Sequence, residues 1–147
     1  MSEVEAYTLD TSAIIAYFAD EPGADWVEHA LTLAGEGKVV TYASFMTHME
    51  VLYRVWNRAG EKAGKAAYLR LKALAIRRLD VSETLLVAAA RLKAIHDLSV
   101  ADAWVAATAL ITESTLVHRD PEFRPLADEL PMLELPPKPS RTKAPRR

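Results

Sequence analysis

The chain has 147 residues, of which half are hydrophobic and 26% are charged, the balance of one globular domain with an apolar core. It contains no cysteine, which excludes a disulfide framework, a thiolate metal site and a thiol nucleophile. The acidic first residues (MSEVE) lack the basic segment of a secretory signal, and no apolar run reaches the roughly 18 residues of a membrane helix, so we expect a soluble cytoplasmic protein.

The net charge of −2 is unevenly distributed along the chain. Residues 136–147 contain five bases and no acid, and this Pro- and Arg-rich stretch is predicted to be a disordered tail that follows a domain of residues 1–135. Without those five bases, 13 bases face 20 acids and the domain carries −7. An acidic domain binds nucleic acid poorly on charge alone, so binding of nucleic acid to this domain would need a local basic surface and a metal.

Apolar runs and helical periodicity alternate along the chain. In chain order they predict a strand at 6–9, helices at 13–18 and 22–33, a strand at 38–42, helices at 45–59 and 61–74, a weak strand at 76–79, helices at 83–96 and 100–110, a strand at 115–117 and an edge strand at 132–135. Strands that alternate with helices indicate an α/β fold in which helices cover both faces of a parallel sheet.

Four acids are candidate site residues because of their positions in these predicted elements. Asp10 and Asp120 each follow a short apolar strand, while Asp102 and Glu50 fall in the first and second turns of helices. In an open α/β sheet, the carboxyl ends of the strands hold the ligand crevice at a topological switch point. Four carboxylates that meet there repel one another unless divalent cations neutralise them, and oxygen ligands suit Mg²⁺ or Mn²⁺.

The same acids also fit purely structural roles. The two that follow strands occupy turn and N-cap positions, where aspartate is common. Glu50 is spaced for an ion pair with Arg54 or for a capping box with Thr47. Asp102 stands three residues after Ser99, as the acid of a capping box does. The spacing therefore leaves both interpretations open for each acid taken singly.

Several segments of the sequence resemble those of PIN-domain ribonucleases. They are residues 9–13 (LDTSA), 49–51 (MEV), 98–103 (LSVADA), 106–109 (AATA) and 118–123 (HRDPEF). An Asp-Thr-Ser triplet alone is a weak signal, whereas the ordered set with these spacings is fairly specific. The resemblance covers nearly the whole chain without its tail, and the length and layout are similar to the toxin half of VapBC-type toxin–antitoxin pairs.

This resemblance implies a three-layer α/β/α sandwich with a mainly parallel sheet. It also implies an endoribonuclease that depends on Mg²⁺ or Mn²⁺, forms a homodimer and is inhibited by a small antitoxin protein. Ser12 would be a nearby hydroxyl and Phe123 a packing residue behind the fourth acid. One departure is His118, at a position often held by a small hydroxyl residue in the family. Carried over residue by residue, the catalytic and metal-site acids are Asp10, Glu50, Asp102 and Asp120.

The chemistry needs residues of this type. Hydrolysis of a phosphodiester requires a deprotonated water and charge stabilisation on the phosphate, and a carboxylate-bound metal supplies both. The candidate substrate contacts are Ser12, His118 and Arg54. Bases recur every three or four residues from Arg54 to Lys65, which predicts either a solvated helix face or a surface that guides phosphates. No glycine-rich phosphate loop is present, so a nucleotide cofactor is not expected.

Three other functions compete with the ribonuclease hypothesis. A phosphatase of the haloacid-dehalogenase type needs a second acid two residues after its nucleophile, and that position is Ser12 here. A PIN-like binding module without catalysis usually lacks one of the metal acids, whereas all four are present in this sequence. Cleavage of DNA instead of RNA uses the same phosphate chemistry and stays open.

Overall fold

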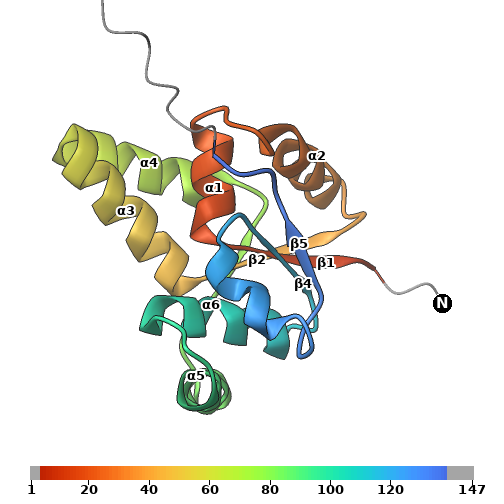
Figure 1. Ribbon diagram of the computed structural model, residues 1–147. Coiled ribbons are helices and arrows are strands. Elements are labelled where there is room, and N and C mark those ends of the chain that lie inside the picture. Colours follow the sequence, from red (N-terminus) through yellow and green to blue (C-terminus); the bar gives the residue numbers. More distant parts are fainter. Residues whose placement is uncertain (1–3, 139–147) are drawn as a thin grey trace, which may run out of the picture.

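The computed structural model describes residues 4–138, and a five-stranded sheet forms their centre (Figure 1). All the strands are parallel, and their order is β3-β2-β1-β4-β5. Their bounds are β1 (Ala6–Leu9), β2 (Val40–Ser44), β3 (Arg77–Leu79), β4 (Thr115–His118) and β5 (Met132–Glu134). The predicted parallel sheet is confirmed, and the strand expected near its C-terminal edge is β5.

Helices connect the strands and cover both faces of the sheet, as Figure 1 shows. In the described part of the chain they are α1 (Thr11–Phe18), α2 (Ala24–Gly35), α3 (Phe45–Ala59), α4 (Glu61–Ala73), α5 (Glu83–Ile95), α6 (Val100–Ile111) and the 3-10 helix η1 (Pro121–Leu126). Each predicted helix is present, with ends that differ by at most two residues from those expected.

Strand β2 and helix α2 both begin two residues later than the sequence predicts. The strand runs from Val40 to Ser44 instead of 38–42. The helix begins at Ala24 because Gly23, with a φ of 98°, forms the turn before it. This left-handed conformation favours glycine, and a Cβ at Gly23 would lie only 3.1 Å from the Cβ of Leu135. The apolar pattern located the helix but not the turn that precedes it.

Neighbouring residues of β4 show that the sheet is packed on both faces. Leu116 belongs to a core formed with α5, α6 and η1, whereas Val117 belongs to a core formed with α1, α2, α3 and α4. Successive side chains of a strand point to opposite faces, so the two cores lie on either side of the sheet. The protein is therefore a three-layer α/β/α sandwich.

The site is positioned by the centre of the sheet, where the strand order reverses direction. Strand β1 pairs with β2 on one side and with β4 on the other, so the switch point lies between β1 and β4. Leu9 is in register with Val117, and the backbone N–H of Asp10 donates to the carbonyl of Val117 at 2.9 Å. The chain consequently leaves both strands side by side at the edge where ligands bind in open α/β sheets.

The end of the described chain returns to the loop between α1 and α2. The backbone N–H of Leu135 donates to the carbonyl of His118 at 2.7 Å, and Nζ of Lys138 lies 3.9 Å from Oε2 of Glu21. Residues 139–147, most of the predicted basic tail, lie outside the described residues. Among residues 4–138, no helix has both the length and the apolar character needed to cross a membrane.

Candidate metal site

Asp10 forms the N-cap of α1 directly after β1. Its Oδ2 accepts hydrogen bonds from the backbone N–H of Ser12 at 3.0 Å and from the hydroxyl of Ser12. Asp10 is only 4% exposed. This burial raises the pKa of Asp10 to about 6, against the opposing effect of the Ser12 hydrogen bonds, and the nearby charge of Glu50 raises it further. The same buried carboxyl therefore caps the helix and lies at the position predicted for the site.

Glu50 lies in the second turn of α3 and is held by two partners. Oε1 accepts from the hydroxyl of Thr11 at 2.8 Å, and Oε2 accepts from Arg54 at 2.7 Å. The predicted ion pair with Arg54 is therefore present. The capping box with Thr47 is wrong, because α3 is capped by Ser44, whose hydroxyl accepts a backbone N–H of the first turn. Thr11 follows Asp10 directly, so it ties Glu50 to the start of α1.

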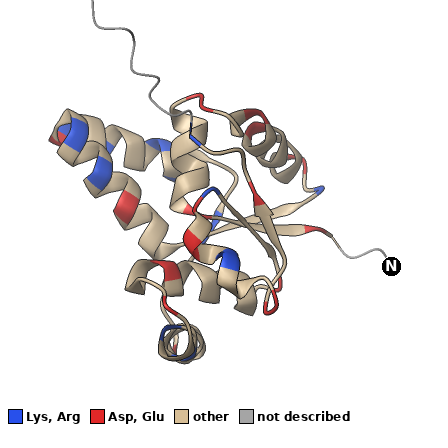
Figure 2. Cartoon of the chain, viewed as in Figure 1, with Lys and Arg blue, Asp and Glu red and all other residues tan. Residues whose placement is uncertain are grey.

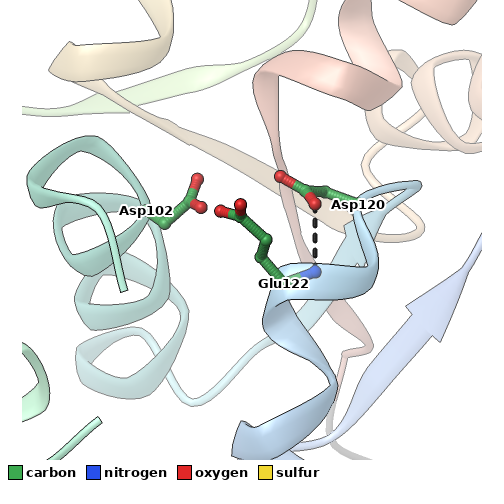
Figure 3. Close-up of side chains that lie close together, drawn as sticks. All are labelled: Asp102, Asp120 and Glu122. Atoms are coloured by element: carbon green, nitrogen blue, oxygen red, sulfur yellow. Dashed lines mark hydrogen bonds between the residues drawn. The ribbon is translucent and has the colours of Figure 1, made fainter. Parts of the chain in front are cut away.

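Asp102, Asp120 and Glu122 come together from two separate elements, as Figure 3 shows. Asp102 lies in the first turn of α6, where the hydroxyl of Ser99 accepts its backbone N–H at 3.1 Å. Asp120 forms the N-cap of η1 and accepts the backbone N–H of Glu122 at 3.0 Å. One carboxylate oxygen from each of the three acids lies within 4.8 Å of the others, a spacing that a single metal ion can bridge. Asp10 and Glu50 stand outside this group.

Electrostatics connect Asp10 to the three-acid group. Partial burial raises the pKa of Asp102 to about 7, and the charge of Asp10, a hydrogen bond with Glu122 and the charge of Asp120 raise it further. Asp10 and Asp102 therefore both hold their protons more tightly than ordinary carboxyls. A divalent cation would reverse these shifts, because it favours the charged form of every carboxylate around it.

Glu122 is the member of this group to which the sequence analysis assigned no role. A signal was present: Asp120 followed by Pro121 predicts a short helix, and Glu122 falls in its first turn. An acid is favourable there because it faces the positive end of the helix. What the sequence does not give is the direction of this turn, which brings Glu122 toward Asp102 across the sheet edge (Figure 3).

His118 lies behind Asp120 and not on the surface. It is 1% exposed, and its Nδ1 accepts the backbone N–H of Asp120 at 3.1 Å. Since a backbone N–H can only donate, Nδ1 carries no proton. Burial lowers the pKa of His118, so the ring is neutral at pH 7. Its ring centroid lies 5.1 Å from that of the fully buried Phe123, so the two rings pack together beneath the Asp120 loop.

The two other candidate substrate contacts lie nearer the surface. Ser12 is partly buried beside Asp10, and the side chain of Arg54 is 50% exposed while it pairs with Glu50. Figure 2 shows acidic positions on α3, the start of α6 and η1, whereas basic positions continue along α3 and α4. The acidic edge of the sheet is thus bordered by positive charge on one side.

The donor set of this edge is made only of oxygen atoms. Carboxylates without histidine or cysteine suit Mg²⁺ or Mn²⁺ and do not suit Zn²⁺. Mutual repulsion adds to burial at this edge, because the charges of Asp10 and Asp120 raise the pKa of Asp102 further. The residues present therefore fit a hard divalent cation.

Comparison with solved structures finds the same fold in toxin–antitoxin proteins. The chain is similar to VapBC2 from Rickettsia felis bound to a DNA fragment from its promoter, with a TM-score of 0.73 and 15% identity over 89% of this chain and 99% of that one. It is similar to a toxin–antitoxin complex from Klebsiella pneumoniae, with a TM-score of 0.61 and 20% identity over 86% and 95% of the two chains. It is also similar to VapC20 of Mycobacterium tuberculosis, a toxin that cleaves the sarcin-ricin loop, with a TM-score of 0.63 and 20% identity over 88% and 99%.

At these identities the solved structures establish the fold alone. No curated protein matches the sequence. The sequence of residues 7–129, which spans both strand ends of the switch point and all five acids described above, matches the family of the PIN domain. The chain therefore belongs to the PIN domain family.

Proposed function

We propose that this protein is a metal-dependent endoribonuclease and the toxin of a type II toxin–antitoxin pair. The observation that carries the proposal is the group of three carboxylates within 4.8 Å, beside the buried Asp10, at the switch point of the sheet. Membership of the PIN domain family supports nuclease chemistry. RNA is the proposed substrate and the cytoplasm the proposed compartment, by likeness to the toxin that cleaves the sarcin-ricin loop.

The proposed roles of the acids follow from their surroundings. Asp10, Asp102, Asp120 and Glu122 would hold Mg²⁺ or Mn²⁺, which supplies an activated water and charge stabilisation on the phosphate. Glu50 would join them, because each of its oxygens accepts a single hydrogen bond, from Thr11 or from Arg54, and keeps a further lone pair for the metal. It keeps a negative charge beside Asp10 and fixes the guanidinium of Arg54 at the border of the site.

Three residues would complete the site around these acids. Ser12 holds Oδ2 of Asp10, and the half-exposed Arg54 is placed to contact a substrate phosphate. His118, which is buried, would act by fixing the backbone of Asp120. Bases on α3 and α4 would then guide the phosphodiester chain toward the acidic edge.

Replacement of single acids tests this proposal. Asp10→Asn and Asp102→Asn keep the size of the side chain but remove its charge, so RNA cleavage with Mg²⁺ should fall about a hundredfold or more. Chelation should abolish cleavage by the wild type. Glu83→Gln is the matched control, because Glu83 lies in the first turn of α5 as Asp102 lies in the first turn of α6. The measurement is single-turnover cleavage of labelled RNA by purified, folded variants.

The outcomes of that assay separate the alternative functions. A folded wild type that binds RNA without cutting it would identify a PIN-like binding module. Equal cleavage of single-stranded DNA would widen the substrate class. Phosphate release from small phosphoesters, without cleavage of RNA, would identify another magnesium-dependent phosphohydrolase. Undiminished cleavage by both aspartate variants would contradict the assigned metal site.

A small antitoxin protein is the proposed partner, and a groove on two helices that also contribute to the site, α1 and α3, supports it. The groove lies between α1, α3 and α4, has a volume of about 390 Å³ and is lined mainly by apolar side chains, with Arg58 and Arg70 among them. The guanidinium of Arg70 stacks on the ring of Phe18, with its Cζ 4.2 Å from the ring centroid. An apolar floor with two arginines suits an amphipathic segment that carries acids, and a base at the end of such a segment would fit among the carboxylates.

A homodimer is the proposed assembly. Four large apolar side chains on α5 and at the start of α6 are about half exposed or more: Leu86, Val87, Ile95 and Val100. Exposed apolar side chains on two helices that pack against each other are typical of a surface that a partner covers. A second copy of the chain is the simplest such partner, because it presents the same patch to its mate.

A further inference from the structure

Arg119 lies between the buried His118 and the acid Asp120, and both its main chain and its side chain contact the region of α1. Its backbone N–H donates to the hydroxyl oxygen of Ser12 at 3.0 Å. Its guanidinium donates to Oε1 of Glu21 at 2.7 Å. Glu21 belongs to the loop after α1, which folds back so that its own N–H donates to the carbonyl of Ala16 at 2.9 Å.

The main-chain contact fixes the direction of the hydrogen bonds that reach Asp10. A backbone N–H can only donate, so the hydroxyl oxygen of Ser12 is the acceptor from Arg119. The single hydroxyl proton of Ser12 is then free to point at Oδ2 of Asp10. A shift of Arg119 would therefore disturb the hydroxyl of Ser12, one of the two donors that hold Oδ2 of Asp10.

The ion pair between the side chains of Arg119 and Glu21 is more buried than an ordinary ion pair on a protein surface. The side chains of Arg119 and Glu21 are 8% and 18% exposed. The hydrogen bond from Arg119 lowers the pKa of Glu21, so the pair is ionic. The other terminal nitrogen of the guanidinium, Nη1, is buried and finds no hydrogen-bond partner among residues 4–138. A buried ion pair with an unsatisfied donor is a poor device for stability, since an apolar pair would fill the space without this loss.

We propose that the Arg119–Glu21 pair is a positioning device that holds the Asp120 loop against α1 and so orients Asp10 and Asp120 toward each other. Both ends of the device are anchored on one rigid element, because Ser12 lies in the first turn of α1 and the Glu21 loop is tied back to its last turns. The inference rests on the proposed function, since it assigns Arg119 and Glu21 to the geometry of the metal site. Both side chains are largely buried, so in this proposal they act through Asp10 and Asp120.

The test uses the full-length variants Glu21→Gln, Arg119→Gln and the double variant. The readouts are Mn²⁺ affinity of the metal-free protein by calorimetry and the single-turnover rate at saturating RNA. Each single variant should lose about tenfold or more in Mn²⁺ affinity or rate, as changes to residues behind metal ligands do, while RNA affinity stays unchanged. The double variant should lose no more than the worse single variant, because both changes break the same contact.

Arg124→Gln is the matched control, because Arg124 also pairs with a glutamate, Glu134, but on the exposed side of the same loop. It should keep wild-type affinity and rate. Glu21→Gln keeps the shape of the side chain, so it tests the device even if Arg119→Gln does not fold. A folded Glu21→Gln with lower thermal stability but wild-type Mn²⁺ affinity and rate would overturn the inference alone. A wild type that neither binds Mn²⁺ nor cleaves RNA would overturn the proposed function as well.

Discussion

At the scale of single residues, the acids of the site are also structural residues. Asp10 and Asp120 cap helices, and Glu50 forms an i,i+4 ion pair. The two interpretations that the sequence left open are therefore compatible in the same side chains. A cap needs a short acceptor and a metal needs a charge, so Asn retains the first property and loses the second.

The buried Asp10 should make the metal-free protein less stable as the pH rises. Burial raises its pKa from 3.8 to about 6, so the folded state holds this proton more tightly than the unfolded chain does. Deprotonation between about pH 4 and pH 7 therefore favours unfolding, by about 3 kcal/mol for this carboxyl alone. The raised pKa of Asp102 acts in the same direction. In urea melts with EDTA across this range, the free energy of unfolding should therefore fall more with rising pH in the wild type than in a variant that lacks the Asp10 carboxyl.

Asp10→Asn should flatten this pH dependence, while the exposed Asp128→Asn should not. Millimolar Mg²⁺ should restore the stability of the wild type near pH 7 by mass action and restore the Asp10→Asn variant less. If the free energies of unfolding of the wild type and Asp10→Asn change in parallel with pH, and Mg²⁺ affects neither, Asp10 has a purely structural role.

How far the site could be predicted differs from residue to residue. The positions of Asp10 and Asp120 follow from short apolar strands that end in an acid, and the Ser99 cap of Asp102 follows from spacing alone. The position of Glu122 depends on the direction of a 3-10 turn, which no periodicity reports. The ion pair between Arg119 and Glu21 joins residues far apart in the sequence, and the local patterns of a single sequence do not predict such long-range contacts.

At the scale of elements, the sequence predicted the helices and strands well where one face or both faces of the element are buried. The edge strand β3 gave only a weak pattern, because two of its three residues, Arg77 and Arg78, are exposed. The late start of α2 depends on Gly23 and on its contact with Leu135, a residue of the opposite end of the chain. Local patterns place elements, whereas long-range packing places their ends.

The contact between α3 and α4 depends on a glycine. A Cβ at Gly64 would lie 2.8 Å from the carbonyl oxygen of Leu52 and 2.8 Å from the Cβ of Trp56, positions that cannot shift without moving α3. Gly64→Ala should therefore destabilise the protein by about 1–3 kcal/mol, despite the better helix propensity of alanine. Urea unfolding measures this change.

Gly35→Ala is the control for this prediction, because it also replaces a helical glycine but has no atom within 4 Å of the new Cβ. Its free energy of unfolding should equal or slightly exceed that of the wild type. Equal stabilities of the two variants would show that the helices separate at little cost.

At the scale of the whole molecule, charge is divided between an acidic body and a basic C-terminal stretch. Deleting residues 139–147 removes four cations, Arg141, Lys143, Arg146 and Arg147, and keeps Lys138 beside Glu21. RNA affinity should fall, and the salt dependence of binding should flatten by up to about 0.7 per lost contact with a single strand. The cleavage rate at saturating RNA should stay unchanged. An unchanged salt slope in a filter-binding titration would show that this stretch does not contact RNA.

The central position of β1 also determines the order in which the molecule can be completed. Tyr7 pairs with Thr115, so strand β1 waits for a neighbour that is synthesised 108 residues later. Proteins fold from the N-terminus as they leave the ribosome, and distant pairings close last. Asp10 is made early, but Asp120 and Glu122 reach it only when β4 and η1 have emerged. A chain whose synthesis stops before η1 thus lacks the assembled acids, and the site forms only after β4 and η1 have been made.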